Sequence, residues 1–460
     1  MSLPAPQEVV ERALAAANGG PCVVIVEESS QSEIRFANNA TTTNGRRRDR
    51  RVVVVRFCDV EGGVAAGVAS QSGDVDVRAM VEAAAADART SPPSPDASEL
   101  VEGGADPAFD EPPAEGDLAA FDPVVDDLAG AFDAARSSDR VLAGFLDHQT
   151  DTVYLGSSTG LRRRHSQPTG AIEMVARSAD GTRSAWMSEA AGDLATVDVR
   201  AMDAVLATRL GWAERTVALD AGRYEVVLPP SAVADLMVDV ANYAGGQDAE
   251  EGRTVFSAPD GGTRIGERLS PLAFHLYGDP AEPGLECAPF LTVGASSSEA
   301  SVFDNGMPIV ATPLITEGRL ANLHYHRAGA ARSGAQFAPP VDNLVLELPG
   351  AGGSTEDLVA RTERGLLLTC LWYIREVDPS TLLLTGLTRD GVYLVEGGEI
   401  VGAVNNFRFN ESPVDLLART IEAGASVRAL GREFGEWVNR SRMPPLRVAD
   451  FNMSSTSAAS

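Results

Sequence analysis

Three neighbouring positions on one expected helix hold the residues most relevant to chemistry in this chain. Residues 224–247 read as a strand that runs into Pro230 and then a helix, because apolar side chains recur three and four residues apart. Asp239 offers a carboxylate, which reads mainly as a helix-surface or hydrogen-bonded group, whereas Val238 has no lone pair. Tyr243 could bind a metal ion only as a phenolate, formed from a phenol with a pKa near ~10. These residues predict little metal chemistry of their own.

Two histidines and a turn form a second group of candidates. His324 and His326 are two residues apart, so on a strand both side chains would point to one face, as metal ligands can. Metal binding and a polar role on the strand surface both remain open for them. Asp304 and Asn305 belong to the sequence FDNG, which favours a tight turn.

Nucleophilic catalysis has weak support. Cys370 lies in an apolar run where a buried thiol is inert, and the acidic neighbours of Cys287 would raise its pKa. The serines of 296–298 lack the GxSxG elbow that exposes a catalytic serine. The four cysteines are far apart, so they predict neither a disulfide framework nor a Cys-rich metal site and fit a reducing compartment.

The elements that position these residues indicate an α+β fold. At 460 residues the chain should form about two or three domains. Short β-branched runs over 21–69 and 140–188, with helices at 76–89, 123–136 and 195–214, predict an N-terminal α/β domain over 1–215 with an antiparallel meander. Its acidic, Pro/Gly-rich segment 91–116 predicts a mobile surface loop.

The second half is rich in short strands. Strand patterns dominate residues 216–450, with helices expected only after Pro230, at 355–361 and at 413–423. Closely spaced strands with Gly-Gly turns predict a closed or strongly curved, barrel-like sheet. The small, polar residues 451–460 predict a flexible tail.

Charge and hydropathy limit the classes of partner that the protein can bind. A formal net charge of −27 argues against nucleic-acid binding. The basic clusters at 46–51 and 162–165 read mainly as solvated strand or loop charge, with docking of an acidic partner or a peptide carboxylate as the alternative. No apolar run is long enough to span a bilayer, and the first 20 residues do not resemble a secretory signal. We therefore expect a cytoplasmic protein without a membrane partner.

Four phrases in order along the chain carry a family resemblance. IRFANNATTTNG (34–45), GERL (266–269), GDP (278–280) and VFDNGMPIVATPLITEGRLANL (302–323) resemble blocks of the TldD/PmbA (TldE) family of peptidase-related proteins. The resemblance implies an α/β N-terminal domain and a β-rich C-terminal domain, in agreement with the patterns above.

The resemblance also gives meaning to the helix after the two prolines. The TldD branch has a His-Glu-x-x-x-His zinc motif there, at the positions of Val238, Asp239 and Tyr243, and a distant cysteine as third ligand. The C-terminal segment MPPLRVADFNMSS has no cysteine, so the chain resembles the metal-free PmbA/TldE branch. We expect no cofactor here, with zinc only in a partner. The block 302–323 and the residues after it would line the cleft, which makes His324, His326, Asp304 and Asn305 the cleft candidates.

This resemblance implies a non-catalytic subunit that forms a heterodimer with a TldD-like zinc peptidase. The complex would process or degrade unfolded or modified peptides, and activity is expected only in that complex. Two alternatives stay open: a stand-alone enzyme of specialised metabolism with a repurposed cleft, and a metal-free peptide-binding homodimer.

Overall fold

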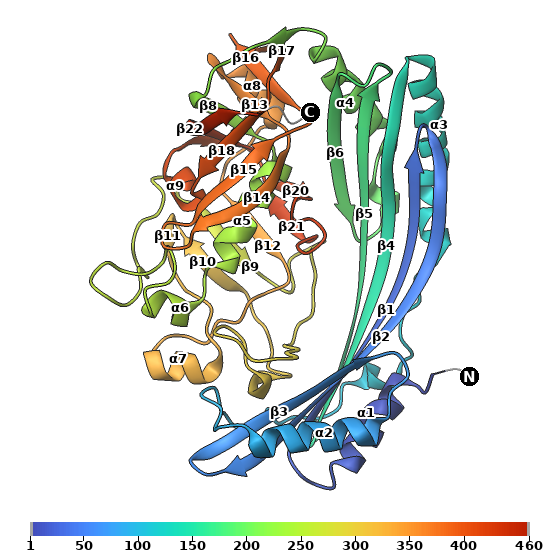
Figure 1. The fold of residues 1–460 in the computed structure, drawn as a ribbon, viewed down its shortest axis with the longest axis vertical. Coiled ribbons are helices and arrows are strands. Elements are labelled where there is room, and N and C mark those ends of the chain that lie inside the picture. The colour runs from blue at the N-terminus through green and yellow to red at the C-terminus, as the bar shows by residue number, and fades with distance from the viewer. Residues whose placement is uncertain (1–2, 458–460) are drawn as a thin grey trace.

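The α+β architecture predicted from the sequence is confirmed. The computed structural model describes residues 3–457, and Figure 1 shows a sheet of long strands standing beside a half built from shorter strands. Within the described residues, no helix combines the length and apolar character needed to cross a membrane.

Six antiparallel strands form the N-terminal sheet, in the order β3-β2-β1-β4-β5-β6. The strands are β1 (Cys22–Ala37), β2 (Ala40–Val60), β3 (Gly63–Ser72), β4 (Arg140–Ser157), β5 (Arg162–Ser178) and β6 (Ser184–Ala191). The accompanying helices are α1 (Pro6–Ala16), α2 (Val77–Thr90), α3 (Asp122–Ser137) and α4 (Val199–Trp212), with short 3-10 turns η1 (Pro107–Asp110), η2 (Leu118–Phe121) and η3 (Leu194–Thr196).

These strands are longer than the sequence predicts. Instead of short runs, β1 continues through the polar residues 29–32, and β4 and β5 are likewise unbroken over 18 and 17 residues. Residues 29–32 pair with 46–49 of β2 on one side and with 148–151 of β4 on the other. The ladder satisfies the backbone of a central strand whatever its side chains, so polarity alone does not end it.

The two ends of this sheet are covered differently. Near α1 and α2 both faces are buried: Val52 and Val54 pack in the cluster with these helices, whereas Val53 and Val55 pack with Phe303 and its neighbours from the C-terminal half. Burial on both faces explains the unbroken valine run. At the other end, α3 and α4 cover one face and the second face carries polar side chains toward a cavity.

Two further sheets build the C-terminal half, as the β-rich prediction requires. The larger has the order β14-β15-β18-β22-β8-β13-β16-β17-β7, with β19 beside β22, and the smaller has the order β11-β10-β9-β12-β21-β20. The larger sheet comprises β7 (Thr216–Val217), β8 (Gly222–Leu228), β13 (Arg364–Leu368), β14 (Leu371–Asp378), β15 (Leu383–Thr388), β16 (Val392–Glu396), β17 (Glu399–Val404), β18 (Phe407–Glu411), β19 (Thr420–Ala423) and β22 (Leu446–Thr456). The smaller comprises β9 (His275–Gly278), β10 (Thr312–Thr316), β11 (Arg319–Leu320), β12 (Leu344–Glu347), β20 (Val427–Ala429) and β21 (Ser441–Met443).

Helix α5 (Pro230–Asn242) lies in the core between these sheets, in contact with β8 of one and with β20 and β21 of the other. The remaining helical elements are α6 (Gly246–Glu250), α7 (Arg327–Ser333), α8 (Thr355–Ala360), α9 (Pro413–Ala418) and the 3-10 turn η4 (Val302–Asp304). Among residues 3–457 no pairing joins β14 to β7, so the larger sheet stays open and the expectation of a closed barrel is corrected.

Two segments expected to be mobile are packed. In the loop 91–116, Asp96 and Phe109 are buried, and the Gly116 N–H donates to Ser30 Oγ at 3.1 Å. The tail expected from residue 451 instead continues β22 to Thr456, which pairs with β18. Residues 458–460 of that tail lie outside the described residues. The domain boundary at 215/216 stays a proposal.

Candidate functional site

Helix α5 is enclosed rather than half exposed. Pro230 starts it, since the fixed φ of proline suits the first helical turn, and every residue from Ala232 to Val240 is buried. Two aspartates, Asp235 and Asp239, are therefore buried in an apolar helix, where a charged carboxylate is costly unless it is hydrogen-bonded. The two aspartates differ in whether their carboxylates are hydrogen-bonded.

Asp235 is fully hydrogen-bonded. Its carboxylate accepts the backbone N–H groups of Arg432, Glu433 and Phe434 at 2.8, 2.9 and 3.1 Å. Burial nevertheless raises its pKa to about 7, against the opposing effect of these hydrogen bonds. Asp235 thus fixes the segment 431–440 to α5.

Asp239, one turn further on, has an unsatisfied oxygen. The residue is only 8% exposed, and its Oδ2 has no hydrogen-bond partner. Burial raises its pKa to about 7, with Glu376 and Glu433 adding to the effect. The sequence predicted a surface or hydrogen-bonded carboxylate at this position, and the burial of the whole helix is why that prediction is wrong.

Val238 and His324 meet at one cavity of ≈360 Å³, which Glu299 and Trp437 also line. Burial lowers the pKa of His324 to about 4, so the imidazole is neutral at pH 7, and its Nδ1 lies 3.3 Å from the Ala338 carbonyl oxygen. Burial raises the pKa of Glu299 to about 7. The prediction that His324 lines a cleft agrees with this geometry.

The residues at the three motif positions do not fit a zinc ion. Val238 has no donor atom, and the Tyr243 hydroxyl donates to Glu376 Oε2 at 2.5 Å. Burial and the Glu376 carboxylate raise the pKa of Tyr243, which disfavours the phenolate that metal binding would need. Asp239 alone would remain as a ligand, and residues 3–457 contain no group of three or more His, Cys, Asp or Glu side chains arranged to hold a metal.

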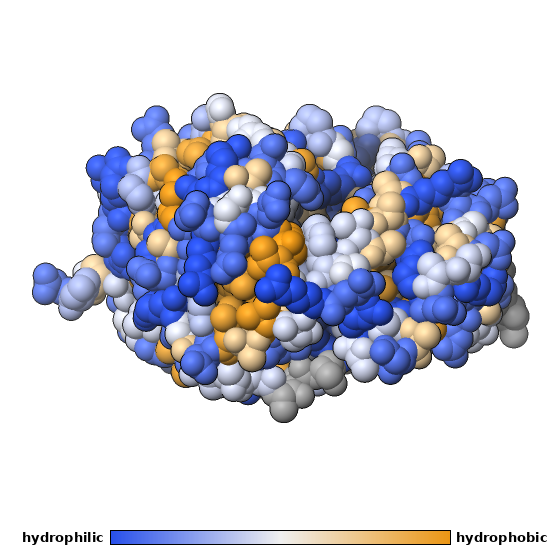
Figure 2. Space-filling model, turned by 90° about the horizontal axis from the view of Figure 1, so that it is seen from above, coloured by the Kyte–Doolittle hydropathy of each residue, from blue (hydrophilic) through white to orange (hydrophobic). Residues whose placement is uncertain are grey.

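A larger cavity of ≈880 Å³ lies between the N-terminal sheet and the segment 431–440. Figure 2 shows the surface hollowed between the two halves of the molecule. The sheet contributes carboxylates such as Asp147 and Glu173, whose pKa values burial raises, and the other wall contributes Trp372 and Trp437. Trp437 lines both cavities and is 77% exposed, so the two cavities adjoin beside it.

Sequence reasoning missed the role of the segment 431–440. The Arg432 guanidinium lies over the rings of Trp186 on β6 and Trp372 on β14, at 5.2 and 4.6 Å from their centroids, and pairs with Asp390 at 3.0 Å. The segment thereby connects α5 to the N-terminal sheet. A polar residue such as Asp235 inside an otherwise apolar helix pattern was the available signal.

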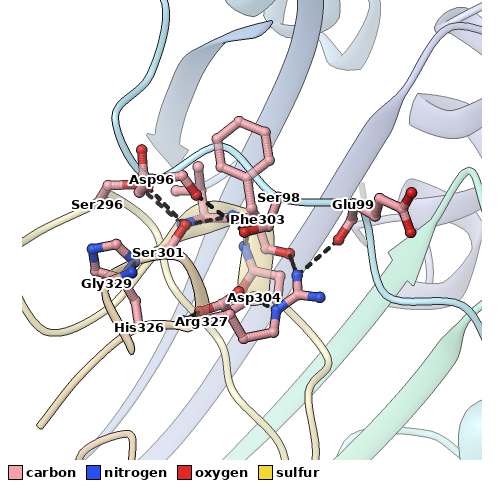
Figure 3. Close-up of polar contacts among 12 residues, drawn as sticks. Asp96, Ser98, Glu99, Ser296, Ser301, Phe303, Asp304, His326, Arg327 and Gly329 are labelled. Atoms are coloured by element: carbon pink, nitrogen blue, oxygen red, sulfur yellow. Dashed lines mark hydrogen bonds and ion pairs between the residues drawn. The ribbon is translucent and has the colours of Figure 1, made fainter. Parts of the chain in front are cut away.

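The other cleft candidates are structural. The Asp304 carboxylate accepts two hydrogen bonds from Arg327, one from Nε at 2.5 Å and one from the backbone N–H at 3.0 Å, as Figure 3 shows. Asn305 accepts from the Val293 N–H and donates to the carbonyl groups of Val293 and Val302. Neither residue lines the two cavities described above.

His326 is likewise a structural residue. It is the N-cap of α7, and its Nδ1 accepts the Gly329 N–H at 3.1 Å. His324 lines the ≈360 Å³ cavity and His326 does not. The Nδ1 of His326 is thus already used as the acceptor of a backbone N–H.

The acidic loop 91–116 contacts the region around Asp304 through Asp96. Asp96 Oδ2 accepts from Ser296 Oγ at 2.5 Å and from Ser301 Oγ at 2.7 Å (Figure 3). These bonds explain why the loop 91–116 is packed against the C-terminal half.

The cysteines agree with the sequence prediction of inert thiols. Burial raises the pKa of Cys287 to about 12, with Asp342 adding to the effect, and burial also raises the pKa of Cys370. Both thiols stay protonated near neutral pH, so neither is an activated nucleophile.

The family model described as the PmbA/TldA metallopeptidase C-terminal domain matches residues 221–455, just over half of the 460-residue chain. No curated protein matches the chain significantly.

Solved structures share the fold across nearly the whole chain. TldE from Thermococcus kodakarensis has a TM-score of 0.77 at 17% identity, covering 97% of this chain and 99% of that one. A putative modulator of a DNA gyrase from Thermotoga maritima has a TM-score of 0.75 at 16% identity, with coverages of 97% and 99%. A putative modulator of DNA gyrase from Bacteroides thetaiotaomicron has 0.72 at 14%, with 98% of each chain covered. The chain belongs to the TldD/PmbA (TldE) family of metallopeptidase-related proteins.

Proposed function

We propose that this protein is a metal-free, non-catalytic TldE-like subunit that forms a heterodimer with a TldD-like zinc peptidase in the cytoplasm. Zinc sits in the partner, and the complex processes unfolded or modified peptides. The observation that carries this proposal is the chemistry of α5: Val238 faces the smaller cavity without a donor atom, and Tyr243 holds its proton against Glu376.

The two cavities support a role in enclosing a peptide. They adjoin at Trp437 and Asp342, and their walls combine carboxylates with aromatic rings. Such walls can accept backbone N–H groups and pack against side chains of varied sequence. Asp235 contributes indirectly, since its three hydrogen bonds hold the segment that carries Trp437.

Reconstitution with a co-expressed TldD-like subunit tests the proposal. We expect the two chains to co-purify, and peptide cleavage to be lost when this chain is omitted. Trp437→Ala should leave the complex intact but raise KM for peptides several-fold, because an exposed aromatic residue at the cavity rim is removed. Val377→Ala, which shortens an exposed apolar side chain that lines neither cavity, is the control and should leave KM unchanged.

Two results would overturn the proposal. One is a purified lone chain that binds stoichiometric zinc and cleaves peptides. The other is a chain that stays a homodimer in size-exclusion chromatography when the TldD-like subunit is present.

A further inference from the structure

The first part of β2 is an exposed, unpaired strand edge. Every residue from Ala40 to Asp49 is exposed. On one side this stretch pairs with β1, but on the other side β3 pairs with β2 only from Arg51 onward. Within residues 3–457 no strand covers the outer side of 40–50.

Such an edge has free hydrogen-bonding groups. In an antiparallel pair, alternate residues direct both N–H and C=O away from the neighbouring strand, so every second residue of this stretch presents them outward. Thr41, Thr42 and Thr43 favour the extended conformation. The one irregularity in the pairing with β1 falls at Thr42, because Arg35 faces Thr43 and Phe36 faces Thr41, so the edge is regular from Thr43 onward. A long regular edge is a template for another strand.

The charge of this edge selects the kind of strand that can pair with it. Arg46, Arg47 and Arg48 form a positive cluster in a chain of net charge −27. The side chains of Arg47 and Arg48 are 74% and 56% exposed, although each has one carboxylate contact, at 2.5 Å, to Asp49 and Glu115 respectively. Pairing with a second copy would bring two such clusters together, and like charges across strands are destabilising. A strand that carries carboxylates is favoured instead.

We propose that the edge 41–49 of β2 is the docking site for an acidic, extended segment of the partner subunit, which adds to the N-terminal sheet as a further strand. This inference rests on the proposed function, because it names a contact surface within that heterodimer. Backbone hydrogen bonds provide the affinity, and the arginines provide the choice of partner.

A charge-reversal pair with a matched control tests the side-chain part. Arg47→Glu with Arg48→Glu should weaken association with a co-expressed TldD-like subunit at least about tenfold, since attraction becomes repulsion. Arg200→Glu with Arg12→Glu changes the net charge equally at side chains of similar exposure, 74% and 59%, and should leave the affinity within about twofold. All four residues are exposed, so both variants should keep the wild-type Tm.

Hydrogen exchange tests the backbone part. Alternate amides of 41–49 should become protected in the wild-type chain when the TldD-like subunit is added. If the wild-type chains do not associate, the proposed function itself fails. If they associate while 41–49 gains no protection, or the two double variants bind equally, the docking site is overturned and the proposed function stands. Protection of 41–49 in a homodimer of the lone chain would also overturn it.

Discussion

The cluster beside α7, formed by Asp96, Asp304, Asn305 and His326, and the surroundings of α5 both contain buried polar side chains. The two regions differ in whether these side chains have hydrogen-bond partners. Asp304 and Asn305 have partners for their side-chain oxygens. On α5, Asp239 keeps an oxygen without a partner and lies near two other carboxylates. The hydrogen bonds of the first region stabilise the fold, whereas the second region contains a buried carboxylate that destabilises it when charged.

The comparison shows how to separate structural from functional polar residues. Sequence patterns marked both regions as candidates, because Asp, Asn and His occur in each. Only the environment distinguishes them, since a buried polar group with all its partners stabilises and one without them does not. Mutations that change one region and spare the other should sharpen this contrast.

The largest effect is expected at Asp304. Asp304→Ala should lower the free energy of unfolding by about 3–5 kcal/mol, because it removes one member of a buried ion pair and the acceptor of the Arg327 N–H. Urea titration followed by circular dichroism measures this. Asp133→Ala, which breaks the exposed pair with Arg136, is the control and should change stability by less than about 1 kcal/mol. Equal effects would contradict the assignment of Asp304 as structural.

Asp235 should come next. Asp235→Ala leaves three backbone N–H groups without an acceptor, and we expect a loss of about 2–4 kcal/mol with faster hydrogen exchange confined to 431–440. Asp235→Asn keeps an acceptor oxygen and should retain part of the protection. Unchanged exchange of 431–440 in the alanine variant would show that Asp235 does not hold this segment.

At Asp239 we expect the opposite effect, because removing the charge should raise the stability of the protein. Its pKa in the folded protein is raised to about 7, so its contribution to stability is fully present below about pH 4 and is lost as the pH rises through 7. Asp239→Asn should therefore be more stable than the wild type by about 1–3 kcal/mol at pH 8, with the difference vanishing near pH 4.

Thermal unfolding of both proteins across this pH range measures the effect of the Asp239 substitution. Asp378→Asn is the control, because hydrogen bonds from Ser380 and Thr381 lower the pKa of Asp378 and its stabilising effect is lost on acidification instead. A wild-type carboxylate that stabilises the protein at pH 8 would contradict the burial account of Asp239.

The smallest effect is expected at His326. His326→Ala removes the side-chain cap of a seven-residue helix and should lower stability by about 1 kcal/mol. His326→Asn should restore most of it, since asparagine is a good N-cap. If the asparagine variant is as unstable as the alanine variant, His326 has a role beyond capping.

Local patterns predicted the elements that have local causes. The start of α5 at Pro230 and its apolar positions follow from proline geometry and helical spacing. The long β1 strand could not be predicted, because its polar residues 29–32 stay extended only through pairing with β2 and β4. The packing of the loop 91–116 depends on bonds between Asp96 and serines some 200 residues away, at 296 and 301.

The site was predictable in part for the same reason. Val238 and Tyr243 could be judged as poor metal ligands from their side chains alone. The unpartnered oxygen of Asp239, and the cavity that Trp437 and Val238 both line, depend on how α5 and the segment 431–440 pack together. The spacing of residues within either segment does not predict this long-range contact.

Zinc content, measured on the lone chain and on its complex with a TldD-like subunit, tests the central claim most directly. We predict no stoichiometric zinc on the lone chain and about one zinc per heterodimer, unchanged by Asp239→Asn in this chain. Stoichiometric zinc on the lone chain that is lost in the Asp239→Asn variant would contradict the account.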